Sequence, residues 1–168
     1  MFEHRSTDLE YMDGPQFSAQ AVADTFRFLV PVNRLFGGLR PTIAYFESEV
    51  AAWDRSHTYA ILDVGSGAGD VAAAIARWAS KTGQSVVIRA IDSHASSVAA
   101  ARERVKPFAN VSVHEGDALS PGDGLYDYVH ASQFLHHFSD QQVPSVLRHL
   151  QSLCRRTVIV NDLLRSPV

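Results

Sequence analysis

The stretch DVGSGAGD, residues 63–70, decides how this chain folds. It overlaps the end of the short apolar run 59–64, which is typical of a buried parallel strand, and it opens the Ala-rich segment 69–81, which predicts a helix. Glycine lets the backbone turn sharply and approach a ligand without an intervening side chain. The free N–H groups at a helix start also favour an anionic ligand group. Taken alone, such a loop is either a ligand cradle or a tight strand-to-helix turn.

Strand and helix patterns continue to alternate beyond this loop. Short apolar or alternating runs predict four more strands, and Ala-rich or amphipathic segments predict two more helices. Such alternation is typical of an α/β domain with a doubly wound, mainly parallel sheet of about five strands. The predicted strands cover 86–92, 111–114, 126–131 and 157–161, and the predicted helices cover 94–106 and 140–154.

The residues ahead of the first strand have a different pattern. The segments 17–35 and 41–53 are amphipathic and predict two helices, the first of which Pro31 would kink or divide. We therefore divide the chain into an N-terminal helical cap, 1–56, and an α/β core, 57–168. The aromatic and aliphatic side chains of the cap could form a lid and substrate wall or cover one face of the sheet, and we expect a mixture of the two. They include Phe17, Phe26, Phe28, Leu35, Phe36, Tyr45 and Phe46.

The composition of the chain excludes several classes of protein. It has 168 residues, of which 46% are hydrophobic and 20% charged, as expected for one globular domain rather than a disordered chain. The net charge of −3 argues against a nucleic-acid partner. The one cysteine, Cys154, excludes an internal disulfide and a CxxC metal or redox motif. No apolar run reaches the length of a membrane span, and residues 1–20 lack the apolar region of a secretion signal, so we expect a cytoplasmic protein.

Two acidic residues stand at the ends of the next predicted strands. Asp92 closes the strand 86–92, and Asp117 follows the strand 111–114. In a doubly wound sheet the carboxyl ends of neighbouring strands share one crevice, so both acids are expected beside the glycine loop. Asp92 could accept hydrogen bonds from a ribose diol, and Asp117 from the exocyclic amine of a purine. Each acid by itself could also be a solvated cap or turn residue.

Four separated segments resemble one family in order and spacing. ILDVGSGAGD (61–70), AID (90–92) and EGDAL (115–119) resemble motifs of the class I S-adenosylmethionine-dependent methyltransferases. YDYVHASQFLHHF (126–138) is similar to the fourth-strand motif of the branch related to quinone and small-molecule methyltransferases. The resemblance covers about residues 57–162. It implies a Rossmann-like fold with the strand order 3-2-1-4-5, N-terminal helices over the active-site mouth, and S-adenosyl-L-methionine as cofactor.

The resemblance also implies which residues contact the cofactor. The glycine loop would line its methionine and ribose part, the residues at the end of 86–92 would bind the ribose hydroxyls, and those after 111–114 would hold the adenine. Residues after the strand 126–131 would flank the methionine end, and a cap arginine could pair with the cofactor carboxylate. In that order these residues are Asp63, Gly65, Ser66, Gly67 and Gly69, then Asp92 and Ser93, Asp117 and Ala118, Ala131 and Ser132, and Arg34.

A nicotinamide dinucleotide fits the glycine loop less well. The pattern GxGxxG would place its third glycine at position 70, which is Asp70. A carboxylate there would repel the phosphates of a dinucleotide, whereas S-adenosylmethionine has no phosphates.

The candidate catalytic residues are His136 and His137, which lie just beyond the predicted strand 126–131. Methyl transfer needs a base when the nucleophile arrives protonated, as a phenol does with a pKa of about 10. Adjacent residues at a helix start point about 100° apart, so we expect only one of the two to face the substrate. Either could instead cap a turn or pack against the following helix. No well-spaced third ligand is evident, so no metal is expected.

The expected acceptor is a small, aromatic or lipophilic molecule, methylated on oxygen or carbon. Phe134 is a candidate substrate residue, and Asn161 and Asp162, at the end of the strand 157–161, either contact substrate or merely end the strand. The family fold continues with two further strands, whereas this chain stops at Val168. The alternatives are therefore a fragment of a longer enzyme, a homodimer completed through the C-terminal sheet edge, or a non-catalytic module that binds S-adenosylmethionine.

Overall fold

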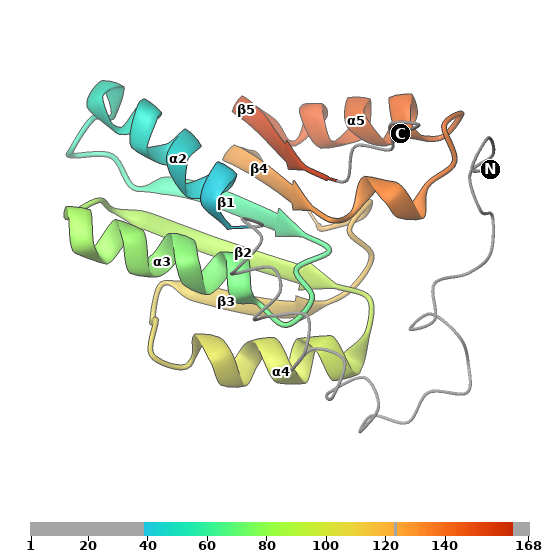
Figure 1. The fold of residues 1–168 in the computed structure, drawn as a ribbon, viewed down its shortest axis with the longest axis horizontal. Coiled ribbons are helices and arrows are strands. Elements are labelled where there is room, and N and C mark those ends of the chain that lie inside the picture. The colour runs from blue at the N-terminus through green and yellow to red at the C-terminus, as the bar shows by residue number, and fades with distance from the viewer. Residues whose placement is uncertain (1–38, 123, 163–168) are drawn as a thin grey trace, which may run out of the picture.

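The described part of the computed structural model, residues 39–122 and 124–162, contains a five-stranded sheet in which every neighbouring pair is parallel (Figure 1). Its strand order, β3-β2-β1-β4-β5, confirms the predicted doubly wound α/β fold. The predicted helix over 17–35 and the candidate Arg34 lie outside the described residues. The strands are β1 (Tyr59–Val64), β2 (Val86–Asp92), β3 (Val111–Glu115), β4 (Tyr126–Ser132) and β5 (Cys154–Asn161).

Helices cover both faces of this sheet (Figure 1). One face carries three α-helices, and the other carries α5, which follows the short 3-10 helix η3 between β4 and β5. The expected helix over 41–53 is divided, because an α-helix ends at Glu49 and a 3-10 helix, η2, follows it. The helices are α2 (Arg40–Glu49), η2 (Val50–Ala52), α3 (Asp70–Thr82), α4 (Ala95–Val105), η3 (Leu135–His137) and α5 (Val143–Ser152).

The boundary between α5 and β5 differs from the sequence prediction. The predicted helix 140–154 is shorter, since α5 ends at Ser152 and β5 already begins at Cys154. The cause is pairing with β4, because the Tyr126 N–H donates to the carbonyl of Leu153 at 2.8 Å and Tyr126 is in register with Cys154. The backbone hydrogen bonds between β4 and β5 therefore determine where the chain changes from helix to strand.

An aromatic cluster forms the core under α2 and α3. Phe46 of α2 is fully buried and its ring packs edge-on against that of Tyr128 in β4. Trp53 stacks on Tyr59 with 4.0 Å between ring centroids, and its indole N–H donates to the Tyr128 hydroxyl at 2.8 Å. Burial raises the pKa of Tyr128 to about 12, so this hydroxyl keeps its proton. Phe46 thus covers the sheet, which is one of the two functions expected for the apolar side chains of the cap.

Helix α5 covers the second face of the described sheet. Val146 and Leu150 of α5 pack on Leu62 of β1 and Val129 of β4.

The boundary between cap and core at residue 56 stays a prediction. In the described part α2 shares one hydrophobic core with the sheet.

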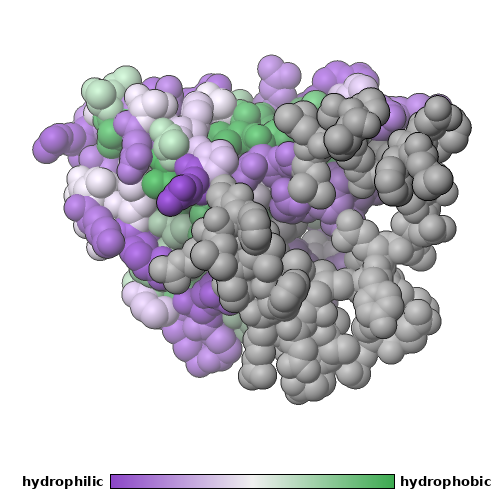
Figure 2. Space-filling model, in the orientation of Figure 1, coloured by the Kyte–Doolittle hydropathy of each residue, from purple (hydrophilic) through white to green (hydrophobic). Residues whose placement is uncertain are grey.

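The surface of the described part is mostly hydrophilic on the face seen in Figure 2, with smaller hydrophobic areas between the polar side chains. No helix within residues 39–122 and 124–162 has the length and apolar character needed to cross a membrane. β5 is the edge strand of the described sheet, and the expected homodimer through this edge stays a prediction, as does the cytoplasmic location.

We expect Phe46→Ala to lower the free energy of unfolding by about 3–5 kcal/mol, because it leaves a cavity among fully packed rings. Glu47→Ala, one position further along the same helix and exposed, serves as the control and should change it by less than about 0.5 kcal/mol. Urea denaturation followed by tryptophan fluorescence measures both. Similar losses for the two variants would show that α2 does not depend on this packing.

Candidate functional site

The glycine loop lies where β1 ends and α3 begins, as the sequence predicts. Gly65, Gly67 and Gly69 have φ values of +60°, +51° and +71°, a backbone conformation that side-chain-bearing residues rarely adopt. Hydrogen bonds with neighbouring elements hold the loop. The Ser66 N–H donates to the carbonyl of Ile91 at 3.0 Å, and Arg104 Nε donates to the carbonyl of Ala68 at 2.8 Å. The loop is therefore held by β2 on one side and by α4 on the other.

A second reason for glycine at position 65 is close contact with Phe134. A Cβ added at Gly65 would lie 2.5 Å from Cδ2 of the Phe134 ring. The Phe134 ring also packs edge-on against Phe138, with 5.1 Å between centroids. The loop that follows β4 thus packs directly on the glycine loop, and the predicted substrate role of Phe134 stays a prediction.

Asp92 accepts hydrogen bonds from the loops that follow β1, β2 and β3. Its Oδ2 accepts the Gly67 N–H at 2.8 Å, and its Oδ1 accepts the His94 N–H at 3.0 Å. Its backbone carbonyl accepts the Gly116 N–H at 3.0 Å. The carboxylate is buried, and both hydrogen bonds stabilise its charge. Ser93, the other residue expected at the ribose, is exposed beside it.

The residues expected near an adenine lie at the same edge of the sheet. Asp117 is exposed, and its Oδ1 accepts the Leu119 N–H at 2.8 Å, which is the turn-capping function that the sequence left open. Ala118 is buried in the core cluster under α5. Contact of either residue with an adenine stays a prediction.

Asp63 lies beneath the glycine loop and is 1% exposed. Its Oδ1 is 2.8 Å from Nδ1 of His130, so one carboxylate oxygen has a partner. Within the described part of the chain, its Oδ2 and the hydroxyl of Ser66 are buried without a hydrogen-bond partner. Burial also raises the pKa of Asp70, and the charge of Asp63 adds to this shift. The loop thus contains polar atoms that a ligand with N–H or O–H donors would satisfy.

Beyond β4, the carboxylate of Asp162 organises the loop that contains both candidate histidines. Its Oδ2 accepts the backbone N–H groups of three consecutive residues, and its Oδ1 is 2.8 Å from Nδ1 of His136. The side chains of His136 and Asp162 are only 9% and 14% exposed. The N–H donors are those of Phe134 (3.1 Å), Leu135 (2.7 Å) and His136 (3.2 Å).

The sequence placed both partners at the same edge of the sheet but did not predict that they pair. His136 and Asp162 are 26 positions apart, and only the adjacency of β4 and β5 brings them together. A partly buried carboxylate thus contacts the imidazole at Nδ1, an arrangement that could orient the ring as a general base. His137 is exposed, with its ring centroid 4.3 Å from that of His136.

The remaining candidates also lie at the ends of β4 and β5. Ala131 is fully buried and is in register with Val160, while Ser132 is in register with Asn161. The Asn161 carbonyl accepts the Gln133 N–H at 2.9 Å. Within residues 39–122 and 124–162, no group of three His, Cys, Asp or Glu side chains is placed to hold a metal ion.

The geometry can now be compared with known proteins. The model of one family, described as "Methyltransferase domain", matches residues 61–157, which is more than half of the chain. This chain is a member of that family. The match runs from β1 to β5 and includes the glycine loop, Asp92 and His136. A comparison with curated proteins finds no match.

Solved structures of methyltransferases share the fold of this domain at low sequence identity. Magnesium protoporphyrin IX methyltransferase from Synechocystis PCC 6803, solved with S-adenosylhomocysteine bound, is 19% identical, with a TM-score of 0.59 over 73% of this chain and 52% of that one. The CMeT domain of the citrinin polyketide synthase is also 19% identical, with a TM-score of 0.63 over 73% of this chain and 34% of that one. This methyltransferase domain therefore spans about half of the first protein and a third of the second.

A third solved structure is similar over more of both chains. It is a protein from Methanococcus maripaludis described as a putative S-adenosyl-L-methionine-dependent methyltransferase. It is 14% identical, with a TM-score of 0.58 over 94% of this chain and 67% of that one. At such identities the likeness establishes the shared fold alone.

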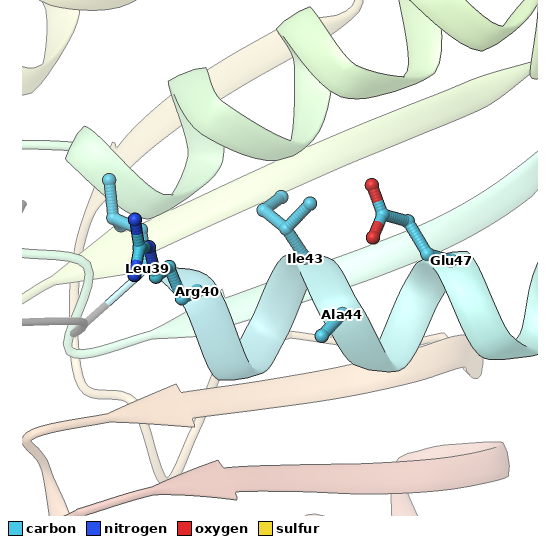
Figure 3. Close-up of a pocket in the computed structure, with 5 residues that line it drawn as sticks. All are labelled: Leu39, Arg40, Ile43, Ala44 and Glu47. Carbon is cyan, nitrogen blue, oxygen red and sulfur yellow. The ribbon is translucent and has the colours of Figure 1, made fainter.

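A separate pocket of about 430 Å³ lies along α2. Ile43 and Glu47 project from one side of this helix (Figure 3). All the lining residues come from α2 and the position just before it. The candidate functional site is instead the polar group made up of the glycine loop and the His136–Asp162 pair. The pocket is lined by Leu39, Arg40, Ile43, Ala44 and Glu47.

Gly65→Ala and Gly83→Ala separate backbone strain from the contact with Phe134. Both glycines have left-handed backbones, with φ values of +60° and +68°, but a Cβ at Gly83 would meet no atom within 4 Å. We expect Gly83→Ala to lower the free energy of unfolding by about 1–2 kcal/mol. Gly65→Ala should cost about 1–3 kcal/mol more, because the Phe134 ring must move. Chemical denaturation measures the free energy of unfolding of both variants. Equal losses would mean that the Phe134 ring moves aside at no energetic cost.

Proposed function

We propose that this domain binds S-adenosyl-L-methionine at the carboxyl ends of β1, β2 and β3 and transfers its methyl group to a small, aromatic or lipophilic acceptor. The acceptor atom would be oxygen or carbon. One observation carries the proposal: His136, paired with Asp162 at the end of β5, stands on a loop that packs against the glycine loop through Phe134 and Gly65. An oriented base therefore lies next to the loop expected to hold the methyl donor.

The residues present fit this cofactor. When bound, it supplies an electrophilic methyl group on a sulfonium, so the protein contributes orientation and a water-poor site. Asp92 lies at the end of β2, where its carboxylate could accept hydrogen bonds from ribose hydroxyls in addition to those from Gly67 and His94. Oδ2 of Asp63, which has no hydrogen-bond partner among the described residues, offers an acceptor for the ammonium group of the methionine part. S-adenosylhomocysteine and S-adenosylmethionine are bound in solved structures of a protein with this fold, which supports the assignment.

In the proposed reaction His136 removes the proton of the acceptor. Asp162 accepts the Nδ1–H of the ring, which places the lone pair of the neutral imidazole on Nε2. Nε2 takes the proton from a hydroxyl or an activated carbon as the methyl group is transferred. The carboxylate of Asp162 stabilises the imidazolium that results. The three N–H bonds to Asp162 keep the loop, and with it the ring, in place.

Calorimetric titration with S-adenosylmethionine and S-adenosylhomocysteine tests the cofactor assignment. We expect both to bind, and Asp92→Ala to weaken binding by more than about 1 kcal/mol, since ribose hydroxyls and the Gly67 N–H would lose an acceptor. Glu115→Ala is the matched control, because it removes an exposed acid that is in register with Asp92 at the end of β3. No binding by the wild type at millimolar cofactor would refute the proposal. Equal affinities of the wild type and Asp92→Ala would remove Asp92 from the site.

His136→Gln tests the base. In a methyl-release screen over phenols and quinols, we expect this variant to lose about 10²–10⁴-fold in kcat while its affinity for S-adenosylhomocysteine is retained. His57→Gln is the control, since His57 also pairs with an aspartate, Asp127, at 3.2 Å but at the opposite end of the sheet. We expect a smaller loss for His137→Gln than for His136→Gln. Wild-type protein that binds cofactor but turns over no acceptor would favour the non-catalytic module.

A further inference from the structure

Three buried polar side chains form a continuous hydrogen-bonded chain from α2 to the glycine loop. Asp63 of β1 and His130 of β4 are in register on neighbouring strands, and Asp63 Oδ1 is 2.8 Å from His130 Nδ1. On the other side of the ring, His130 Nε2 is 2.9 Å from Oγ1 of Thr42 in α2. Thr42 is 1% exposed, and the side chains of His130 and Asp63 are 0% and 2% exposed. Solvent does not reach any of the three groups.

The hydrogen bonds define a direction along this chain. An ionised carboxylate can only accept, which assigns the hydrogen of His130 to Nδ1; in this tautomer Nε2 is an acceptor and the Thr42 hydroxyl donates to it. Thr42 is the third residue of α2. Here the hydroxyl leaves its own helix to satisfy a ring 88 positions away. Without it, Nε2 would be a buried acceptor with no partner, which costs more than an ordinary hydrogen bond contributes.

The far end of the chain is the acid beside the candidate cofactor loop. Asp63 is two positions ahead of Gly65, and its Oδ2 has no partner in the described part of the protein. Because Oδ1 is fixed by His130, the direction of Oδ2 is fixed as well. The contacts of Thr42 and His130 therefore connect α2 to the carboxylate that carries this unpartnered oxygen.

We propose that Thr42 is a positioning residue for the cofactor site. Through His130 it holds the Asp63 carboxylate in the orientation in which Oδ2 meets the cofactor, so that the docking of α2 and cofactor binding favour one another. This inference rests on the proposed function, because it requires a ligand at Asp63. By thermodynamic reciprocity, cofactor binding must also stabilise α2 on the sheet.

Thr42→Val and Thr42→Ser test the chain of contacts. Valine keeps the shape of threonine and removes the hydroxyl, whereas serine keeps the hydroxyl. We expect Thr42→Val to bind S-adenosylhomocysteine at least about fivefold more weakly in calorimetric titration, and Thr42→Ser to stay within about twofold of the wild type. Ser48→Ala is the control on the same helix, because the Ser48 hydroxyl is exposed and bonds only the local carbonyl of Tyr45 among the hydrogen bonds described.

The ¹⁵N chemical shifts of the His130 ring report on its hydrogen bond with Thr42, and a general loss of stability does not change them in the folded protein. Thr42→Val should shift the Nε2 resonance of the folded protein while Nδ1 stays protonated, and Thr42→Ser should restore it. Equal affinity of the wild type and Thr42→Val for S-adenosylhomocysteine would overturn the inference and leave the proposed function standing. No binding by the wild type would instead overturn the proposed function, and this inference with it.

A measurement on the wild type keeps the inference testable even if Thr42→Val fails to fold. Amide hydrogen exchange over Arg40–Glu49 should slow when S-adenosylhomocysteine is added at saturating concentration. The amides of α5, on the other face of the sheet, serve as the internal reference. Slowing in α2 beyond that in α5 supports the coupling. Unchanged exchange in α2 with cofactor bound overturns it.

Discussion

The hydrogen-bonded register that holds β1 between β2 and β4 is the constraint on which the rest of this structure depends. β1 is an interior strand, and Ile61, Leu62 and Val64 are fully buried, so it cannot shift without exposing its apolar side chains. Because the pairing is parallel, the carboxyl ends of the strands meet at one edge. That edge therefore gathers Asp63, Asp92 and the loop that contains His136.

Buried and partly buried carboxylates then hold the loops that leave this edge. Asp92 accepts N–H groups of Gly67 and His94, and Asp162 accepts three N–H groups from the loop beyond β4. A buried carboxylate is tolerated when such donors satisfy it. These two acids thus order the loops before any ligand arrives, which reduces the conformational entropy lost on binding and keeps the His136 ring in place.

Proteins with different names share the scaffold of this domain. The family match runs from β1 to β5, while solved methyltransferases with this fold have names as different as a protoporphyrin methyltransferase and a polyketide synthase domain. A fold common to such proteins does not by itself identify an acceptor. We propose His136 and Phe134 as the residues whose surroundings select the acceptor.

The sequence by itself determined the strands, the glycine loop and the parallel α/β class. Buried parallel strands are short apolar runs, and the positive φ values at the end of β1 call for glycine, so both features are local. Only the tertiary structure decided the end of α5 and the partners of the buried polar groups. Asp162 meets His136 across 26 positions, and Asp63 meets His130 across 67. Such pairs depend on which strands become neighbours and in what register, which spacing along the chain does not encode.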